Sequence, residues 1–264
     1  MIKVTLVGYT PNPLYVCAEA AAVCYNSEPD LKIVKGCIRS GHQSVLEHCS
    51  FTFRVEGISR ACSHQLVRHR IASYSQQSQR YVTYGDLEWA TYGVPADTVD
   101  ELESYCDFSL LNYRKMIEKG VKAEDAREVL PNATPTIVYV TMNLRALIHF
   151  CNERMCTRAQ AEIRKVASLM KEQIMWVENI SVEEKTILSD VLVPKCEAGP
   201  IKACPEIKGC GRCKPLKEFV WRPKAKWQAR DTFLWYCSEC GSGTDGNPAF
   251  CPCCGAEMTG CEEK

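Results

Sequence analysis

The chain has 264 residues, of which 46% are hydrophobic, and can bury a sizeable core as one large domain or as a domain with an appendage. Lys plus Arg equals Asp plus Glu, at 32 each, so the net charge gives no attraction to nucleic acid or to an anionic membrane. No run of about 18 apolar residues occurs, and the first residues lack the apolar stretch of a signal peptide. We therefore expect a globular cytoplasmic protein that is neither exported nor inserted into a membrane.

The predicted elements begin with two strands, each followed by a helix. Residues 2–7 alternate apolar and polar side chains, which is the period of a half-buried strand, and residues 18–24 indicate a buried helix. Residues 51–55 alternate in the same way and predict a second strand. A helix is predicted to begin after Ser59, a favourable N-cap, and its C-terminal end carries the Arg-His-Arg run at residues 68–70.

The next stretch is predicted to be mostly helical. An amphipathic helix over 99–119 stops at Gly120, a typical C-cap, and a short helix with an acidic start ends at Pro131. Residues 136–141 are rich in β-branched side chains and indicate a strand. The helices predicted beyond this strand cover residues 144–155 and 158–177. Because strands and helices alternate irregularly, we expect an α+β fold with a mixed or antiparallel sheet and packed helices.

One segment has the composition of an anion-binding site. Residues 57–85 contain no Asp, Glu or Lys, yet they hold Arg60, Arg68, Arg70, Arg80, His64 and His69. A guanidinium binds phosphate or carboxylate oxygens in pairs, and the Ser and Gln side chains of residues 73–79 add hydroxyls and amides that bind phosphates or a base edge. The segment therefore predicts a nucleotide site. A solvated polar loop after a helix is the alternative.

The spacing within this segment resembles a known family. Arg68-His69-Arg70, seven residues and then Ser78 is the defining pattern of the flavin-dependent thymidylate synthases, and Arg80-Tyr81 also fits it. Other matching segments extend the resemblance over about residues 15–195. Residues 41–48, 126–131 and 155–162 each resemble a block of that family.

The resemblance implies a reaction and a set of site residues. The reaction is the reductive methylation of dUMP to dTMP, with methylenetetrahydrofolate as carbon donor and FAD as the hydride carrier, recharged by NADPH. The residues implied to contact FAD are Ser44, Arg68, His69, Arg70, Gln76, Asn143, Arg145 and His149. Those implied to contact dUMP are Gln65, Leu66, Val67, Arg68, Gln76, Gln77, Ser78, Gln79, Arg80, Arg127 and Arg154.

Arg154 is the implied catalytic residue, because the family places this arginine at the uracil edge, where its charge would stabilise negative charge developing on the ring. Two positions depart from the family: Gln76 stands where many relatives have Glu, and His149 where some have Asn. Ser78 lacks a neighbouring base and is not expected to be a nucleophile. No Gly-x-Gly-x-x-Gly stretch occurs, so a Rossmann motif is not expected to hold FAD or NADPH.

The cysteines mark a change of character near residue 195. Eight of the 18 lie in residues 1–195, and ten crowd into the remaining 69. We therefore expect a core over 1–195, a basic cysteine-containing linker over 196–230, and a small module over 231–264. With no export signal, these cysteines are expected to be thiols rather than disulfides.

The module carries a metal-binding pattern. Cys237 and Cys240, then Cys251 and Cys254, form two Cys-x-x-Cys-Gly knuckles separated by ten residues, which is typical of a zinc ribbon. Iron in a rubredoxin-like site is the alternative ion. A second site is conceivable at Cys196, Cys204, Cys210 and Cys213.

Two other functions remain open at this stage. One is a nucleic-acid-binding protein in which the arginines contact backbone phosphates, although the neutral total charge and the acidic module, with six acids and one Lys, argue against it. The other is a flavoenzyme that acts on a different pyrimidine. The resemblance also implies a homotetramer.

Overall fold

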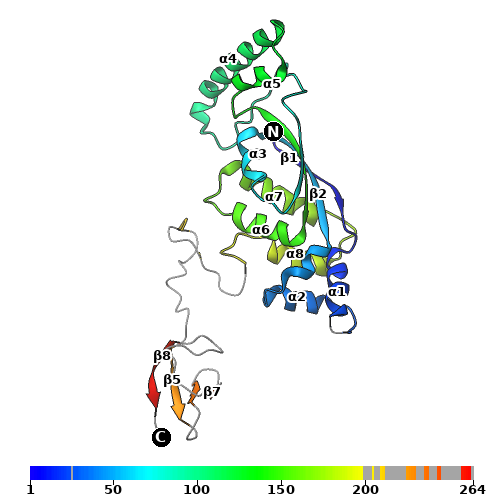
Figure 1. Ribbon diagram of the computed structural model, residues 1–264, viewed down its shortest axis with the longest axis vertical. Helices are drawn as coiled ribbons and strands as arrows, with labels where there is room; N and C mark the ends of the chain where they lie inside the picture. The colour runs from blue at the N-terminus through cyan, green and yellow to red at the C-terminus, as the bar shows by residue number, and fades with distance from the viewer. Residues whose placement is uncertain are drawn as a thin grey trace. The chain divides into compact units, whose positions relative to one another are not determined.

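The computed structural model describes residues 1–24, 26–198, 204, 209–211, 224–229, 235–237, 243–244 and 257–262. The chain divides into two compact units, Met1–Lys202 and Ala203–Lys264, and each is described by itself (Figure 1). None of the described helices is long and apolar enough to cross a membrane.

The first unit is built on an antiparallel sheet with the strand order β1-β2-β4-β3. Its strands are β1 Lys3–Tyr9, β2 Ser50–Ser59, β3 Ser73–Gln76 and β4 Pro135–Asn143. Alternate side chains bury one face, and on the two central strands Phe53 faces Val140 and Val55 faces Val138, all fully buried. On the other face the Thr52 and Thr141 hydroxyls share a hydrogen bond of 2.9 Å, and Tyr139 is 44% exposed.

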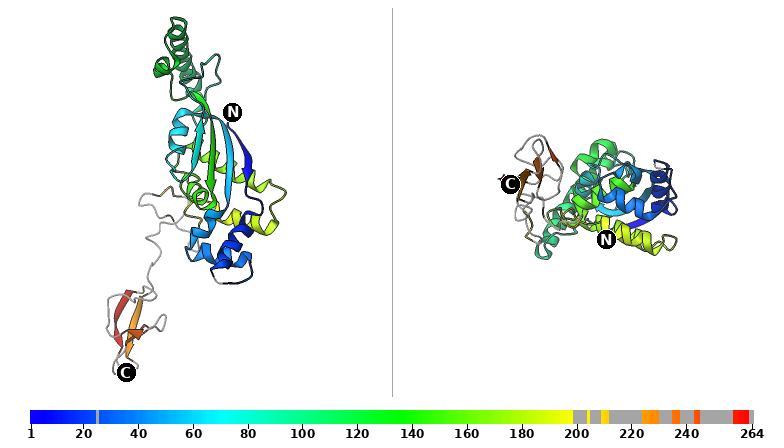
Figure 2. Two further views of the ribbon diagram at one scale, coloured as in Figure 1. Left: turned by 45° about the vertical axis from the view of Figure 1, so that its right-hand side comes forward. Right: turned by 90° about the horizontal axis from the view of Figure 1, so that it is seen from below.

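Helices pack on the buried face of this sheet and at both of its ends. Their bounds are α1 Pro13–Val23, α2 Leu31–Arg39, α3 Arg60–Leu66, α4 Val99–Glu118, α5 Ala123–Ala126, α6 Leu144–Arg154, α7 Ala161–Met175 and α8 Val182–Val191. Short 3-10 helices are η1 Gln43–His48, η2 Ala96–Thr98 and η3 Arg127–Val129. Helix α7 contacts β1, β2, α3 and α6. Figure 1 and the left view of Figure 2 place α4 and α5 at one end of the sheet, opposite α1 and α2.

Two hydrophobic clusters hold the first unit together. The main one joins the buried face of the sheet to α1, α2, α6, α7 and α8. The second lies beneath α4 and consists of Tyr84, Trp89, Cys106, Leu110, Tyr113 and Ala126. The helical projection seen in Figure 1 therefore has its own small core.

The predicted α+β fold is confirmed, with an antiparallel sheet. Strands β1, β2 and β4 and the long helix α4 lie where the periodicity indicates, and Gly120 has the positive φ of 83° expected of a C-cap. Helix α1 starts earlier than predicted, because Asn12 takes a left-handed conformation and Pro13 stands in the first turn. Helices α2 and α8 and strand β3 lie outside the predicted elements.

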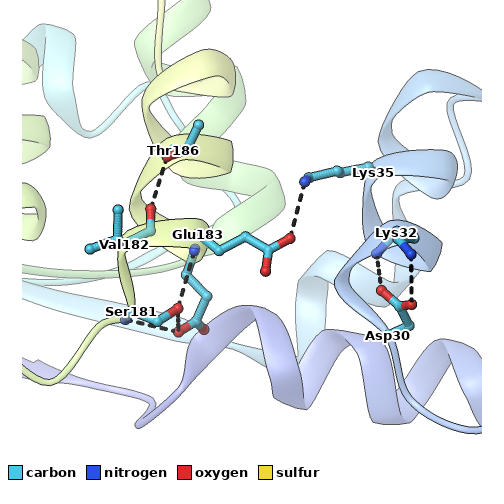
Figure 3. A network of polar contacts seen from close by, with 8 residues as sticks. Asp30, Lys32, Lys35, Ser181, Val182, Glu183 and Thr186 are labelled. Atoms are coloured by element: carbon cyan, nitrogen blue, oxygen red, sulfur yellow. Dashed lines mark hydrogen bonds and ion pairs between the residues drawn. The ribbon is translucent and has the colours of Figure 1, made fainter.

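One ion pair joins helix α2 to helix α8, and Figure 3 shows it together with the polar contacts at the start of each helix. The Lys35 ammonium is 3.2 Å from the Glu183 carboxylate, and both side chains are about half exposed. Ser181 begins α8 with a capping box: its hydroxyl accepts from the Glu184 N–H, and the Glu184 carboxylate accepts from the Ser181 N–H. The buried Glu184 carboxylate also accepts from the Leu14 N–H of α1 at 3.0 Å.

The second unit contains a sheet with the order β7-β6-β5-β8. Its strands are β5 Lys224–Ala229, β6 Trp235–Cys237, β7 Gly243–Thr244 and β8 Glu257–Glu262. Strand β6 is antiparallel to both β5 and β7, whereas β8 is parallel to β5.

A buried carboxylate on α7 fixes the start of α3. Glu162 is 2% exposed, and it accepts from the Ser59 N–H and from the Ser59 hydroxyl, both at 2.6 Å. The same Ser59 hydroxyl accepts from the Cys62 N–H at 2.9 Å and so caps α3. Burial raises the pKa of Glu162, and the bonds from Ser59 oppose that rise. This network ties α7 to the helix that leads into the Arg-His-Arg run.

We expect Glu162→Ala to lower the melting temperature by roughly 5–10 °C, because it leaves the buried N–H and hydroxyl of Ser59 without this acceptor, at a cost of about 3 kcal/mol. Glu183→Ala is the matched control. It removes an exposed ion pair, and we expect a change of less than about 2 °C. Thermal unfolding followed by circular dichroism measures both, and equal shifts would show that the Glu162 network does not stabilise the fold.

Candidate active site

The Arg-His-Arg run follows the C-terminal end of α3, as the sequence predicts. Arg68 and Arg70 are exposed, and neither guanidinium has a protein partner within residues 1–24 and 26–198. His69 turns inward instead and is half-buried. Cations are favoured beside a helix C-terminus by the helix dipole, so this position needs no carboxylate to hold the two arginines.

His69 meets Arg154 at the end of α6. The Arg154 Nε donates to His69 Nε2 at 2.9 Å, and the His69 ring packs against the Phe150 ring in a T-shaped contact at 4.9 Å. The ring centroids of His69 and His149 are 5.7 Å apart. Burial lowers the pKa of His69 to about 4, and the Arg154 and His149 charges add to this effect. The imidazole is therefore neutral at neutral pH.

Strand β3 supports this group from the edge of the sheet. The Tyr74 hydroxyl is 2.8 Å from the His69 carbonyl oxygen and 2.9 Å from that of Leu66, so it donates to one of them at a time. Burial raises the pKa of Tyr74 to about 12, which keeps the hydroxyl a donor. Leu66 itself is fully buried, so only its backbone is close to the polar groups.

Gln76 points from β3 into the protein. Its amide nitrogen donates to the Ser63 hydroxyl at 2.9 Å and to the Thr136 hydroxyl at 3.3 Å. An ionised Glu at this position would offer only acceptors. The exchange of Glu for Gln noted in the sequence therefore lets this side chain donate to two hydroxyls of the protein.

Residues 77–80 form a second group with Arg60 of α3 and Arg127 of η3. Arg60 Nη1 donates to the Gln77 carbonyl at 3.5 Å, and Ser78 Oγ accepts from the Arg80 N–H at 3.2 Å. Arg80 is ion-paired with Glu124 at 2.8 Å. The Arg127 Nε donates to the backbone carbonyl of Glu124 at 3.0 Å. Burial lowers the pKa of Arg60, and so does the nearby Arg127 charge.

Residues 57–85 contain no acidic residue, but in the fold α5 brings the Glu124 carboxylate to Arg80. That pairing joins residues 44 positions apart, and no spacing in the sequence signals it. Arg60 lies in the predicted anion-binding window, but the family pattern assigns it to neither ligand. Tyr74 was missed as well, although its place in a Ser-Tyr-Ser-Gln alternation is a weak strand signal.

The start of α6 carries the remaining predicted cofactor contacts. The Asn143 side-chain oxygen accepts from the Ala146 N–H at 2.8 Å, which makes it the N-cap of this helix. Arg145 is ion-paired with Glu47 of η1 at 2.6 Å, and this brings η1, with its exposed Ser44, beside α6. His149 is exposed on the same helix as Arg145, one turn further on.

The structure thus gathers two sets of predicted residues. Arg154 and His149 each lie against His69, whereas Arg80 and Arg127 both contact Glu124. Among the described contacts none joins these two sets directly, and β3 is the segment that connects them. Near the C-terminal end of α3, the Gln65 amide donates to the Gln160 side chain.

The predicted metal ligands fall largely outside the described residues. Cys237 ends β6, whereas Cys240, Cys251 and Cys254 lie outside, as does Cys213 of the second set. Cys204 is buried, and Cys196 and Cys210 are half-buried. Among the residues that the structure describes, no group of three or more His, Cys, Asp or Glu side chains has the arrangement of a metal site.

Comparison with known proteins decides the family. A family model described as "Thymidylate synthase complementing protein" matches residues 5–177. The chain belongs to this family. It is 45% identical to the flavin-dependent thymidylate synthase of Geobacter sulfurreducens over 234 residues, covering 82% of this chain and 97% of that protein. The flavin-dependent thymidylate synthase of Clostridium tetani is 37% identical over 252 residues, covering 82% of this chain and 96% of the relative.

Two solved structures share the fold of this chain. One is a UMP/dUMP methylase from Streptomyces cacaoi bound with 5-Br dUMP, with a TM-score of 0.60, 24% identity, and coverage of 73% of this chain and 97% of that chain. The other is a flavin-dependent thymidylate synthase from Helicobacter pylori complexed with FAD and dUMP. Its TM-score is 0.58 at 23% identity, covering 72% of this chain and 99% of that chain.

Proposed function

We propose that this chain is a flavin-dependent thymidylate synthase, which makes dTMP from dUMP with FAD. The observation that carries this function is its likeness to proteins of that name over nearly their whole length, at 45% identity in one case. The geometry agrees with it, because the residues that match the family pattern form a cluster of cations around a neutral histidine. A cluster of that kind suits a phosphate-bearing ligand.

The residues proposed to hold FAD fit such a cofactor. Arg68 and Arg70 are exposed guanidiniums with no protein partner in the part of the chain that the structure describes. The buried Nδ1 of His69 also lacks a partner there, so it is a donor left for an acceptor atom of a ligand. The rest of the proposed FAD set is Ser44, Gln76, Asn143, Arg145 and His149.

The residues proposed to hold dUMP lie in α3 and the turn after it, at the end of β3 and in the loop that follows, in η3 and at the end of α6. They are Gln65, Leu66, Val67, Arg68, Gln76, Gln77, Ser78, Gln79, Arg80, Arg127 and Arg154. Arg80 and Arg127 are proposed to bind the nucleotide phosphate, with Ser78 as a further hydrogen-bond donor. Since Arg80 is now paired with Glu124, phosphate binding would replace or share that ion pair.

We assign the catalytic role to Arg154. Its positive charge, held beside the uracil ring, would stabilise the negative charge that develops there during the reaction. When bound, reduced FAD supplies the hydride. Methylenetetrahydrofolate is the proposed carbon donor and NADPH the proposed reductant. The protein's own part is to bind, orient and charge-stabilise the substrate, so no protein nucleophile is required.

Ser78 does not fit a nucleophile. Its hydroxyl oxygen accepts from the Arg80 N–H of its own loop, and its neighbours Gln77 and Gln79 are not bases. The Pro-Cys pair that a cysteine-dependent synthase would use occurs here only at Pro252-Cys253, within the metal-binding pattern. We therefore propose a binding role for Ser78.

We also propose that residues 231–264 form a zinc ribbon joined to the 1–195 core by the basic linker 196–230. Strand β8 is parallel to β5, and both are antiparallel to β6, so β7 and β8 begin at the same end of the sheet. Each Cys-x-x-Cys-Gly knuckle ends two residues before one of these strands. This topology supports one tetrathiolate site formed by Cys237, Cys240, Cys251 and Cys254.

A homotetramer and a cytoplasmic location complete the proposal. The family resemblance supports both proposals. Iron remains the alternative ion for the ribbon, because tetrathiolate knuckles of this kind suit either metal.

The purified protein should be yellow with bound flavin, and it should oxidise NADPH and form dTMP only when dUMP and methylenetetrahydrofolate are both present. Arg154→Ala should retain flavin but lose dTMP formation by at least about 100-fold, because the charge beside the ring is gone. Ser78→Ala, in contrast, should keep measurable turnover. Visible absorbance and product chromatography measure these outcomes. A colourless, inactive wild type would rule out the function, and an active Arg154→Ala would rule out the role of Arg154.

The full-length protein should contain about one zinc ion per chain, as measured by mass spectrometry of the metal. The double substitution Cys251→Ser and Cys254→Ser should remove it, because two of four thiolates are lost. Cys24→Ser, which replaces an exposed thiol of the first unit, is the control and should leave the metal content unchanged. Iron with the absorbance of a ferric thiolate would favour the rubredoxin-like alternative, and no metal would contradict the site.

A further inference from the structure

Arg154 differs from Arg80 and Arg145 in the group that holds its side chain. Arg80 is paired with Glu124 and Arg145 with Glu47, so each of these charges is offset by a carboxylate. The Nε of Arg154 is held by an imidazole nitrogen at 2.9 Å, and no carboxylate pairs with Arg154 among the described residues. Its charge is therefore oriented without being neutralised.

The bond fixes the protonation of His69. Because Nε2 accepts from Arg154, the proton of the neutral imidazole is on Nδ1. A protonated His69 would have no lone pair for Arg154 and would repel it. Burial and the charges of Arg154 and His149 keep the pKa of this ring low, at about 4, so the accepting form is the one present at neutral pH.

His69 is itself held from several sides. The Tyr74 hydroxyl of β3 lies 2.8 Å from the His69 backbone carbonyl oxygen. The Phe150 ring of α6 makes a T-shaped contact with the His69 ring at 4.9 Å between centroids. The carbonyls of Thr157 and Ala159, in the turn after Arg154, accept from Arg164 Nη1 at 3.1 and 2.9 Å. Both partners of the bond therefore sit on supported backbone.

We propose that His69 is a positioning residue for Arg154: its neutral Nε2 holds the guanidinium through Nε and leaves both terminal nitrogens, with the full positive charge, to the substrate. This rests on the proposed function, in which Arg154 stabilises charge on the uracil ring. It gives His69 a role in the chemical step in addition to the cofactor contact expected from the family pattern. A carboxylate in place of the imidazole would hold Arg154 equally well but would offset its charge.

Three substitutions of His69 separate holding from charge. His69→Gln places an amide oxygen where Nε2 lies and so keeps a neutral acceptor for Arg154. His69→Asn keeps an amide near Nδ1 but is too short to reach Arg154. His69→Glu keeps an acceptor of the same reach as Gln and adds a negative charge. The kcat and KM for dUMP are measured for each holoenzyme, with flavin content from visible absorbance as the control for cofactor loading.

We expect His69→Gln to retain kcat within about 5-fold of the wild type, and His69→Asn and His69→Glu to lose roughly 10- to 100-fold, because misplacing or neutralising a catalytic charge has effects of this size. A purely structural or cofactor-binding role predicts instead that kcat per bound flavin is the same in the three variants, or that Asn is the better replacement. Either result would overturn the inference.

Coupling to Arg154 gives a second measurement that does not depend on how well any one variant folds. Arg154→Lys keeps a positive charge but has no Nε, so its activity should no longer depend on His69. His69→Asn should therefore cost much less, less than about 3-fold, in the Arg154→Lys background than in the wild type. Equal losses in the two backgrounds would show that His69 does not act through Arg154. An inactive wild type would instead remove the proposed function, and this role with it.

Discussion

The pairing of β2 with β4 is the constraint on which the site depends. These antiparallel strands form the middle of the sheet, and their register sets Ser59 opposite Pro135 and Ser50 opposite Asn143. Helix α3 follows β2 and α6 follows β4, so the two helices start at opposite ends of the strands. Both helices contact β4, and their C-terminal ends meet where Arg154 donates to His69.

The lengths of these elements bring the two helix C-termini together. Strands of nine and ten residues span about 30 Å, whereas helices of seven and eleven residues span about 10 and 16 Å. The helices therefore cover most of the strand length between them and end a short distance apart. The Arg-His-Arg turn after α3 bridges that distance, and the bond from Arg154 to His69 closes it.

This meeting of helix ends also explains how the site carries so many cations. Each helix C-terminus has a partial negative charge, which favours nearby arginines without using a carboxylate. Arg68, Arg70 and Arg154 all lie at such ends, and none of them is ion-paired within the described residues 1–24 and 26–198. Their charge remains available to an anionic ligand. Arg80, in contrast, must break its ion pair with Glu124 or share it with the ligand before it can bind the ligand's anionic group.

Sequence alone predicts those parts of this arrangement that depend on local periodicity. The alternation around Phe53 gives β2, Ser59 gives the start of α3, and the Gly at 120 ends α4, because each signal is contained in a few neighbouring residues. Strand β3 was missed since its Ser-Tyr-Ser-Gln sequence is polar and only four residues long, and it gains its conformation by pairing with β4. Contacts such as Arg80 with Glu124, or Glu162 with Ser59, join distant segments and have no local signal.

The same distinction applies to the residues of the site. The family pattern finds His69 and Arg154 as separate positions, 85 residues apart, and treats them as contacts of different ligands. Only the fold shows that one holds the other. A neutral acceptor is what a catalytic cation requires there, since a carboxylate would weaken the field that the arginine presents to the substrate and a charged imidazole would repel it. Burial of the His69 ring is thus part of the chemistry, because it keeps that ring neutral and able to accept.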